Sequence, residues 1–176
     1  MMSPRALALP LDERSDARAG GLARLRAITS EDLTPVKVML QNLPRDYPKG
    51  DEWLSRRLGE VLEGGAHCTV ADLGGRLVGV TLLTRKNHAT KLSTIFVAHD
   101  LRGRGLGSAL LDDAIVQART GEATCEGIAE LYVTVAHHKW SLLAPLLTSR
   151  GFVVAATELN RYGRGRHEVI ATRLGQ

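Results

Sequence analysis

The sequence predicts a mixed α/β (α+β) fold, in which a seven-stranded, mostly antiparallel sheet carries helices on both faces. Some segments alternate apolar and polar residues, as strands do, and others repeat apolar residues at helical spacing. The two kinds follow each other in the order β-α-α-β-β-β-α-β-α-β-β. Strands that are neighbours in sequence should pair antiparallel, whereas the two strands on either side of the third helix should be parallel.

The N-terminal half begins with a strand and two helices. Alternating apolar and basic residues predict the strand, and Thr29 or Ser30 before acidic residues predicts a helix start. Two prolines and a glycine then predict a loop, and the amphipathic segment EWLSRRLGEVLEG predicts a helix that ends at Gly64 and Gly65. The predicted bounds are a strand at 23–28, a helix at 30–41, a loop at 42–52 and a helix at 52–64.

A hairpin opens the second half of the predicted sheet. Its strands, HCTVADL and RLVGVTLLT, are joined by the tight turn Gly74–Gly75. Leu110, Leu111 and Ala114 then recur at helical spacing in the third helix. The predicted bounds are strands at 67–73, 76–84 and 90–97, a helix at 106–118, a strand at 130–136, a helix at 139–150, and strands at 152–159 and 167–174.

The length of 176 residues suits one compact domain, which we assign to residues 23–176 after a flexible arm at 1–22. No segment approaches the length of a membrane span, and the N-terminal apolar run is too short for a signal peptide, so we expect a cytoplasmic protein with no membrane contact. Cys68 and Cys125 form no metal-binding spacing, so we expect no metal site and assign the two thiols no function.

The balance of charge is mildly basic, with a formal net charge of +4 and a pI near 9.4. Such a balance fits an anionic small ligand, a weak contact with nucleic acid, or no charged partner.

The segment FVAHDLRGRGLG places glycines and arginines between an apolar strand and a helix. This combination costs free energy on folding, because glycines lose much backbone entropy and clustered guanidinium groups repel each other. A helix start after a glycine-rich turn presents free backbone N–H groups and a partial positive charge, which together bind an anion, most often phosphate. A P-loop is excluded because no lysine follows Gly107, and a dinucleotide-binding fingerprint is excluded because Ser108 occupies its third glycine position.

The pattern Arg-x-x-Gly-x-Gly, made by Arg102, Gly105 and Gly107, fits better. The segment IFVAHDLRGRGLGSALL resembles the acyl-CoA-binding segment of the GNAT superfamily of acyl-CoA-dependent N-acyltransferases. The predicted element order is similar to the fold of that family, and the pair GF at 151–152 lies where the family has it after the last helix. The resemblance covers residues 23–174 and implies that the cofactor is acetyl-CoA.

The resemblance also implies roles for the residues of this segment. Backbone N–H groups would hold the pyrophosphate of coenzyme A, and the backbone of the preceding strand would pair with the pantetheine arm. An amide near Ile95 would polarise the thioester carbonyl, while Arg102 or Arg104 would add positive charge. The implied cofactor-binding residues are Ile95, Phe96, Val97, Arg102, Gly103, Arg104, Gly105, Leu106, Gly107 and Ser108.

The usual catalytic groups of the family are missing. The strand at 90–97 has no carboxylate, Leu147 stands four residues before Gly151 where the family often has a tyrosine, and Trp140 replaces the usual asparagine. The remaining candidates for moving a proton are His138, His137, Tyr132 with Thr134 on the same strand face, and Ser93. Glu168 is expected to be a solvated carboxylate at a sheet edge.

Acidic residues suggest where the acceptor enters. Asp46, Tyr47, Asp51 and Glu52 fall between the first two helices, a loop that borders the acceptor entrance in the family, and carboxylates there would attract a cationic amine. The turn RYGRGRH at 161–167 could instead hold an anionic acceptor or RNA, although a plain basic turn is the favoured interpretation.

The predicted activity is therefore transfer of an acetyl group from acetyl-CoA to the amine of a small molecule, directly within a ternary complex. One alternative is acetylation of a macromolecular amine, on a protein or an aminoacyl-tRNA. Another is a non-catalytic sensor that binds acyl-CoA. The chain could also form a homodimer.

Overall fold

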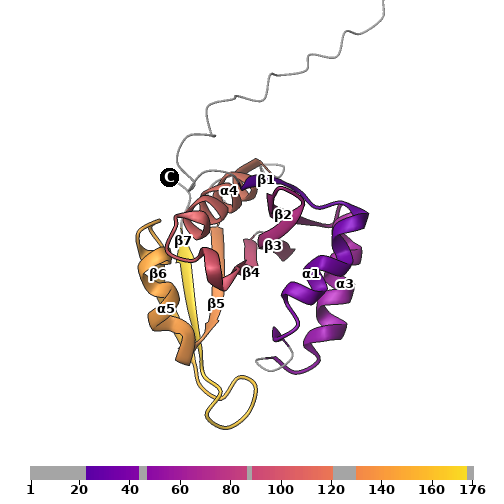
Figure 1. The fold of residues 1–176 in the computed structure, drawn as a ribbon. Helices are drawn as coiled ribbons and strands as arrows, with labels where there is room; N and C mark the ends of the chain where they lie inside the picture. The colour runs from indigo at the N-terminus through magenta and orange to yellow at the C-terminus, as the bar shows by residue number, and fades with distance from the viewer. Residues whose placement is uncertain (1–22, 44–46, 87–88, 121–129, 174–176) are drawn as a thin grey trace, which may run out of the picture.

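The computed structural model describes residues 23–43, 47–86, 89–120 and 130–173 (Figure 1). The predicted arm at 1–22 lies outside the described residues. Seven strands form one sheet in the order β1-β2-β3-β4-β5-β7-β6. Every neighbouring pair is antiparallel except β4 and β5, which are parallel. The predicted fold class and the single parallel pair are confirmed.

The elements follow the predicted order, with bounds that differ by a few residues. The strands are β1 (Arg24–Ala27), β2 (Ala66–Leu73), β3 (Arg76–Lys86), β4 (Ala89–Val97), β5 (Glu130–Ala136), β6 (Val153–Glu158) and β7 (Glu168–Arg173). The α-helices are α1 (Leu33–Met39), α3 (Gly50–Leu62), α4 (Leu106–Thr120) and α5 (His137–Thr148), and short 3-10 turns cover Ser30–Asp32 and His99–Leu101.

The sheet separates two hydrophobic layers (Figure 1). On one face, α1 and α3 pack against β2 and β3, with Val70 and Val80 directly opposite each other beneath them. On the other face, α4 crosses β3 and β4 while α5 packs against β5 and β7. The core there includes Val133, Val135 and Ala171.

Two helices begin earlier than the sequence predicts. The loop expected at 42–52 ends sooner, because α3 begins at Gly50 after Lys49 takes a left-handed conformation with φ of 56°. Asp51 and Glu52 therefore lie in the first turn of α3, where carboxylates favour a helix N-terminus. The helix expected at 139 begins at His137, directly after β5, because Ala136 is both the last residue of the strand and the helix N-cap.

A charged network fixes β1 to the start of α1. The Arg26 guanidinium donates two hydrogen bonds to Asp32, of 2.6 and 3.0 Å, and two to Asp72, of 3.0 and 3.1 Å. The Asp32 carboxylate also accepts from the backbone N and the hydroxyl of Thr29. The hydrogen bonds from Arg26 hold the pKa of Asp32 well below its usual range, although burial acts in the opposite direction.

Replacing Asp32 with Asn should destabilise the fold by about 2 kcal/mol at pH 7, because the half-buried Arg26 guanidinium loses its charged hydrogen bonds to Asp32 and keeps only those to Asp72 among the described residues. The lowered pKa of Asp32 means that its contribution is present above pH ~4 and is lost as the pH falls further. Urea unfolding at pH 7 and in acid measures both effects. The exposed pair Arg76–Asp100 supplies the control, since Asp100→Asn should change the free energy of unfolding far less than Asp32→Asn does.

Cys68 is 1% exposed, and burial raises the pKa of its thiol to about 12. The thiol is therefore shielded from solvent and protonated near neutral pH. Cys125 lies outside the described residues.

Candidate functional site

The two parallel strands separate before they end. The pairing of β4 with β5 runs from Ala89↔Glu130 to Leu92↔Val133 and stops there, although β4 continues to Val97 and β5 to Ala136. Figure 1 shows the two strands diverging. We call residues 93–97 and 134–136 the β4–β5 splay. It leaves strand backbone in the middle of the sheet without a neighbouring strand.

The backbone of β4 faces the splay at alternate residues. Ala98 N donates to Val78 O on the β3 side at 2.8 Å, so the antiparallel ladder directs the polar groups of Phe96 toward β3 and those of Ile95 and Val97 toward the splay. Val97 O accepts a hydrogen bond of 3.0 Å from Arg102 Nε. Of the three predicted backbone contacts, Ile95 and Val97 are thus in place to pair with an extended ligand, and Phe96 is not.

The Arg-Gly turn leads from the splay into α4. Gly103 and Gly105 have φ of 74° and 85°, a left-handed region that glycine adopts without strain, and a Cβ on Gly103 would meet no atom within 4 Å. The first bond of this helix joins Ala109 N to Gly105 O at 3.0 Å, so the N–H groups of the residues before Ala109 have no acceptor within the helix. Those residues are Leu106, Gly107 and Ser108. Free N–H groups, a helix N-terminus and open glycines together fit a diphosphate.

Gly107 and Arg102 hold this turn in shape. A Cβ on Gly107 would lie 3.6 Å from Leu146 of α5 and 3.8 Å from Val97, which are ordinary van der Waals distances, so the start of α4 lies between α5 and β4. Arg102 lies over the ring of Phe96, 5.8 Å from its centroid, in addition to its bond to Val97 O. Arg104 is exposed. The predicted arginines therefore differ, since Arg102 closes the end of β4 and Arg104 points into solvent.

The α1–α3 face of the sheet carries the polar candidates beside the splay. Tyr132 and Thr134 share this face, as predicted, because Leu131, Val133 and Val135 occupy the opposite face in the core under α5. Thr94 of β4 lies on the same face as its partner Leu82, is buried, and its hydroxyl has no hydrogen-bond partner among the described residues. Ser93 lies at a bulge of β4, where its hydroxyl is 2.7 Å from that of Thr84.

His137 and His138 occupy the first turn of α5 and are both exposed. His137 N donates to His167 O at 2.9 Å, and the two imidazole rings lie edge to face with centroids 6.3 Å apart. These contacts join the end of β5 to the start of β7. His137 is thereby placed beside the splay, but as a helix residue and not as the strand-end residue that was predicted.

Two loops distant in sequence meet through a pair of aromatic rings. Tyr47, before α3, and Tyr162, between β6 and β7, stack edge to face with ring centroids 5.5 Å apart. Both connections lie at the same end of the molecule in Figure 1. Asp51 and Glu52 are exposed nearby in sequence, and Asp46 lies outside the described residues. The contact between Tyr47 and Tyr162 could not be predicted from the sequence, because no local pattern links residues so far apart.

The basic turn at 161–167 is partly neutralised within itself. Arg161 forms an ion pair with Glu158 and lies 5.7 Å from the centroid of the Tyr162 ring. Asn160 accepts a hydrogen bond of 2.7 Å from Gly165 N, and its own N–H donates to His167 Nδ1. These contacts hold the turn in shape, while Arg164 and Arg166 remain exposed.

The expectation for Glu168 was wrong. It assumed that the last strand lies at the sheet edge, but β7 lies between β5 and β6, and Glu168 is only 1% exposed. Neither of its carboxylate oxygens has a hydrogen-bond partner among the described residues. A buried, unpaired carboxylate is rare in a folded protein.

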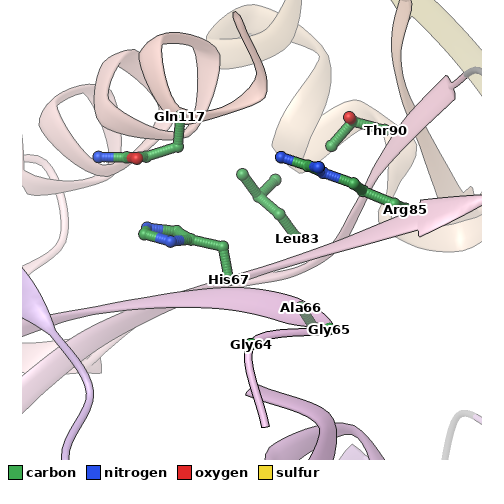
Figure 2. A pocket seen from close by; sticks show the side chains of 8 residues that line it. All are labelled: Gly64, Gly65, Ala66, His67, Leu83, Arg85, Thr90 and Gln117. Atoms are coloured by element: carbon green, nitrogen blue, oxygen red, sulfur yellow. The ribbon is translucent and has the colours of Figure 1, made fainter. Parts of the chain in front are cut away.

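A pocket of about 160 Å³ lies away from the splay, at the opposite end of β4 (Figure 2). His67 and Gln117 extend over it from β2 and α4, with Leu83 and Arg85 of β3 opposite. The hydroxyl of Thr69 lies next to this pocket. It donates a hydrogen bond of 2.7 Å to Asp113 of α4 and lies 3.2 Å from His67 Nε2. The position of this pocket separates it from the Arg-Gly turn.

A mixed sheet with a splayed parallel pair, followed by a glycine-rich helix start, defines the class of acyl-CoA-dependent acetyltransferases. The Acetyltransferase (GNAT) family matches residues 26–142, about two thirds of the chain. The chain belongs to this family, whose members are transferases.

Solved structures of this family share the fold. A putative GNAT acetyltransferase from Desulfovibrio desulfuricans has a TM-score of 0.71 and 18% identity, with 86% of this chain and 98% of that chain covered. The ribosomal-protein-S18-alanine N-acetyltransferase of Escherichia coli has a TM-score of 0.69 and 21% identity, covering 87% and 94%. A GNAT acetyltransferase from Elizabethkingia anophelis, solved with acetyl-CoA bound, has a TM-score of 0.68 and 16% identity, covering 88% and 99%.

Among curated proteins, no sequence matches this chain. Within the described residues, no helix has both the length and the apolar character needed to cross a membrane.

Proposed function

We propose that this protein transfers the acetyl group of acetyl-CoA to the amine of a small molecule, directly within a ternary complex. The observation that carries the proposal is the β4–β5 splay, which ends at a turn built to hold a diphosphate. A strand edge next to an anion site suits a ligand with an extended amide-bearing arm and a pyrophosphate.

The donor half of the site works through backbone groups. The N–H groups of Leu106, Gly107 and Ser108 bind the pyrophosphate at the N-terminus of α4, and Gly103, where a Cβ would meet no atom within 4 Å, leaves room for it to approach. Ile95 and Val97 offer polar backbone groups along the splay. The N–H of Ile95 is the candidate to polarise the thioester carbonyl, where negative charge develops during transfer.

The acceptor half favours a compact cationic molecule. The contact between Tyr47 and Tyr162 joins the two loops that border the acceptor side and narrows the space for a polypeptide. Aromatic faces attract an ammonium group, and the carboxylates of Asp51 and Glu52 in the first turn of α3 add a negative field.

A macromolecular acceptor is the second candidate. Two structures with a similar fold are ribosomal-protein-alanine N-acetyltransferases, from Brucella melitensis and Escherichia coli, each 21% identical to this chain. Arg164 and Arg166 are exposed in the β6–β7 turn and would favour an acidic or nucleic-acid surface.

Release of free thiol from acetyl-CoA tests these candidates together. The acceptors are small primary amines, peptides with free N-termini, and aminoacyl-tRNA. We expect kcat/KM to be at least about tenfold higher for a small amine than for the other two. A preference for peptides or tRNA would contradict the small-molecule assignment. Binding of acetyl-CoA in calorimetry without turnover of any acceptor would indicate a sensor instead.

Replacing Tyr162 with Ala should raise KM for the small amine about fivefold and leave kcat nearly unchanged, because the ring contributes binding and not chemistry. Steady-state kinetics measures the two constants separately. Tyr162→Phe keeps the edge-to-face contact and serves as the control. An unchanged KM in Tyr162→Ala would show that this ring does not bind the acceptor.

A further inference from the structure

The carboxylate of Glu168 is the strongest unexplained feature of the chain. Its side chain is 1% exposed, and both oxygens lack a hydrogen-bond partner among the described residues. Burial of an unpaired charge is costly, so proteins keep such a group where a ligand completes it. The question is which ligand this carboxylate faces.

Strand register gives the direction of the side chain. Residues directly opposite each other on antiparallel strands point to the same face, and Glu168 lies opposite Ala136 of β5 and Glu158 of β6. Two residues along, Ile170 lies opposite Thr134, and Tyr132 follows at the next step of β5 on the same face. Glu168 therefore points to the α1–α3 face, away from the core under α5.

This face is also where the other orphaned group beside the splay lies. The hydroxyl of Thr94 on β4 is buried without a partner among the described residues, and it shares the α1–α3 face. The two unpaired polar groups are thus the Thr94 hydroxyl of β4 and the Glu168 carboxylate of β7, which lie on opposite sides of the splay. Both groups therefore lie on the same face of the sheet, one on each side of β5, without a partner in the described residues.

Charge indicates the kind of group that belongs there. The opposing carboxylate on β6, Glu158, is neutralised by Arg161, whereas no ion pair of Glu168 is found among the described residues. Tyr162 and Tyr47 contribute aromatic rings from the loops that border the same side. An unpaired carboxylate is complementary to an alkylammonium group, and aromatic rings attract the same kind of cation.

We propose that Glu168 binds the ammonium group of the acceptor and takes its proton, which makes it the catalytic base that the sequence lacked at the usual position. The inference rests on the proposed function. The carboxylate accepts one proton from R–NH3⁺, and the freed lone pair attacks the acetyl carbonyl carbon. The new C–N bond forms as the C–S bond breaks, a second N–H proton passes to the departing thiolate, and Glu168 returns its proton to solvent.

Glu168→Gln tests the assignment, because it keeps the shape of the side chain and removes the charge. With the best amine of the thiol-release panel, kcat/KM should fall about 100-fold, while acetyl-CoA affinity is unchanged and the Tm is no lower than that of the wild type. A hydrazide of the same skeleton is already neutral at pH 7 and needs no base. The fall in kcat/KM that Glu168→Gln causes with the hydrazide should therefore be at least about tenfold smaller than with the amine. Glu168→Asp should recover part of the amine activity.

Glu158→Gln is the matched control, since Glu158 lies opposite Glu168 but is exposed and paired with Arg161. It should keep amine kcat/KM within about threefold of the wild type. Equal losses of Glu168→Gln on the amine and the hydrazide would overturn the proposal, as would wild-type activity in that variant.

A binding measurement separates this proposal from the proposed function. n-Butylammonium should raise the Tm of the wild type by about 2 °C at high concentration and leave Glu168→Gln unaffected. This result would support the ammonium site even if no acceptor is acetylated. An equal rise in both proteins, or none in the wild type, would show that Glu168 does not receive an ammonium group.

Discussion

Ser108→Glu should weaken the binding of acetyl-CoA about 1000-fold without unfolding the protein. The residue lies in the first turn of α4, where the N–H groups of Leu106, Gly107 and Ser108 have no acceptor within the helix. A carboxylate placed there competes for these N–H groups and repels the diphosphate. At a separation near 4 Å and a surface-like dielectric, the repulsion is about 4 kcal/mol.

The same substitution should not harm folding, because a carboxylate in the first turn stabilises a helix N-terminus. Ser108→Gln is the matched control, with the same length and no charge, and it should change affinity far less. Isothermal titration with acetyl-CoA measures both variants, and thermal unfolding checks their stability. Undiminished affinity in Ser108→Glu would mean that the diphosphate binds elsewhere.

Ser108 is a better position for this test than the neighbouring glycines. Gly105 has φ of 85°, so any side chain there adds backbone strain to the intended charge effect. A Cβ at Gly107 would already be in van der Waals contact with Leu146 and Val97, so a side chain as long as Glu would disturb the contact of α4 with α5.

Local patterns were sufficient to predict most of the fold. The Gly74–Gly75 hairpin and the helix start after the Arg-Gly turn depend on residues close together in sequence, and the parallel pair follows from the helical crossover that connects its two strands. The errors in element bounds occurred where a local sequence pattern is compatible with two structures. Prolines and acids suggested a loop through Glu52, but a left-handed Lys49 allows α3 to begin at Gly50.

The acceptor side was predicted less well, because its residues gain their environment from distant strands. Glu168 looked like a solvated edge residue until the order β5-β7-β6 placed its strand inside the sheet. Tyr162 was part of a basic turn in the sequence, and only the folded chain brings it to Tyr47. The proposed donor side is made of backbone and glycines in one continuous segment, and for that reason a sequence pattern could predict it.

Phe152→Ala should destabilise the protein by about 4 kcal/mol and weaken the donor site indirectly. Phe152 is 1% exposed in the core beside Leu147. Its N–H donates to Leu147 O at 3.2 Å, while Gly151 N donates to Thr148 O at 3.0 Å, which is the Schellman arrangement at the end of α5. Removing the ring leaves a cavity under this helix end.

The cavity should also affect the proposed donor site. A shift of α5 would move the start of α4, because Leu146 of α5 lies against Gly107. We therefore expect a modest rise in the Kd for acetyl-CoA, of about threefold, together with the large loss of stability. Urea unfolding followed by circular dichroism gives the free energy of unfolding, and Phe152→Leu, which fills most of the space, should cost less than about 1.5 kcal/mol. A loss below about 1 kcal/mol in Phe152→Ala would show that the GF pair does not anchor α5, and the position of α4 would then need another explanation.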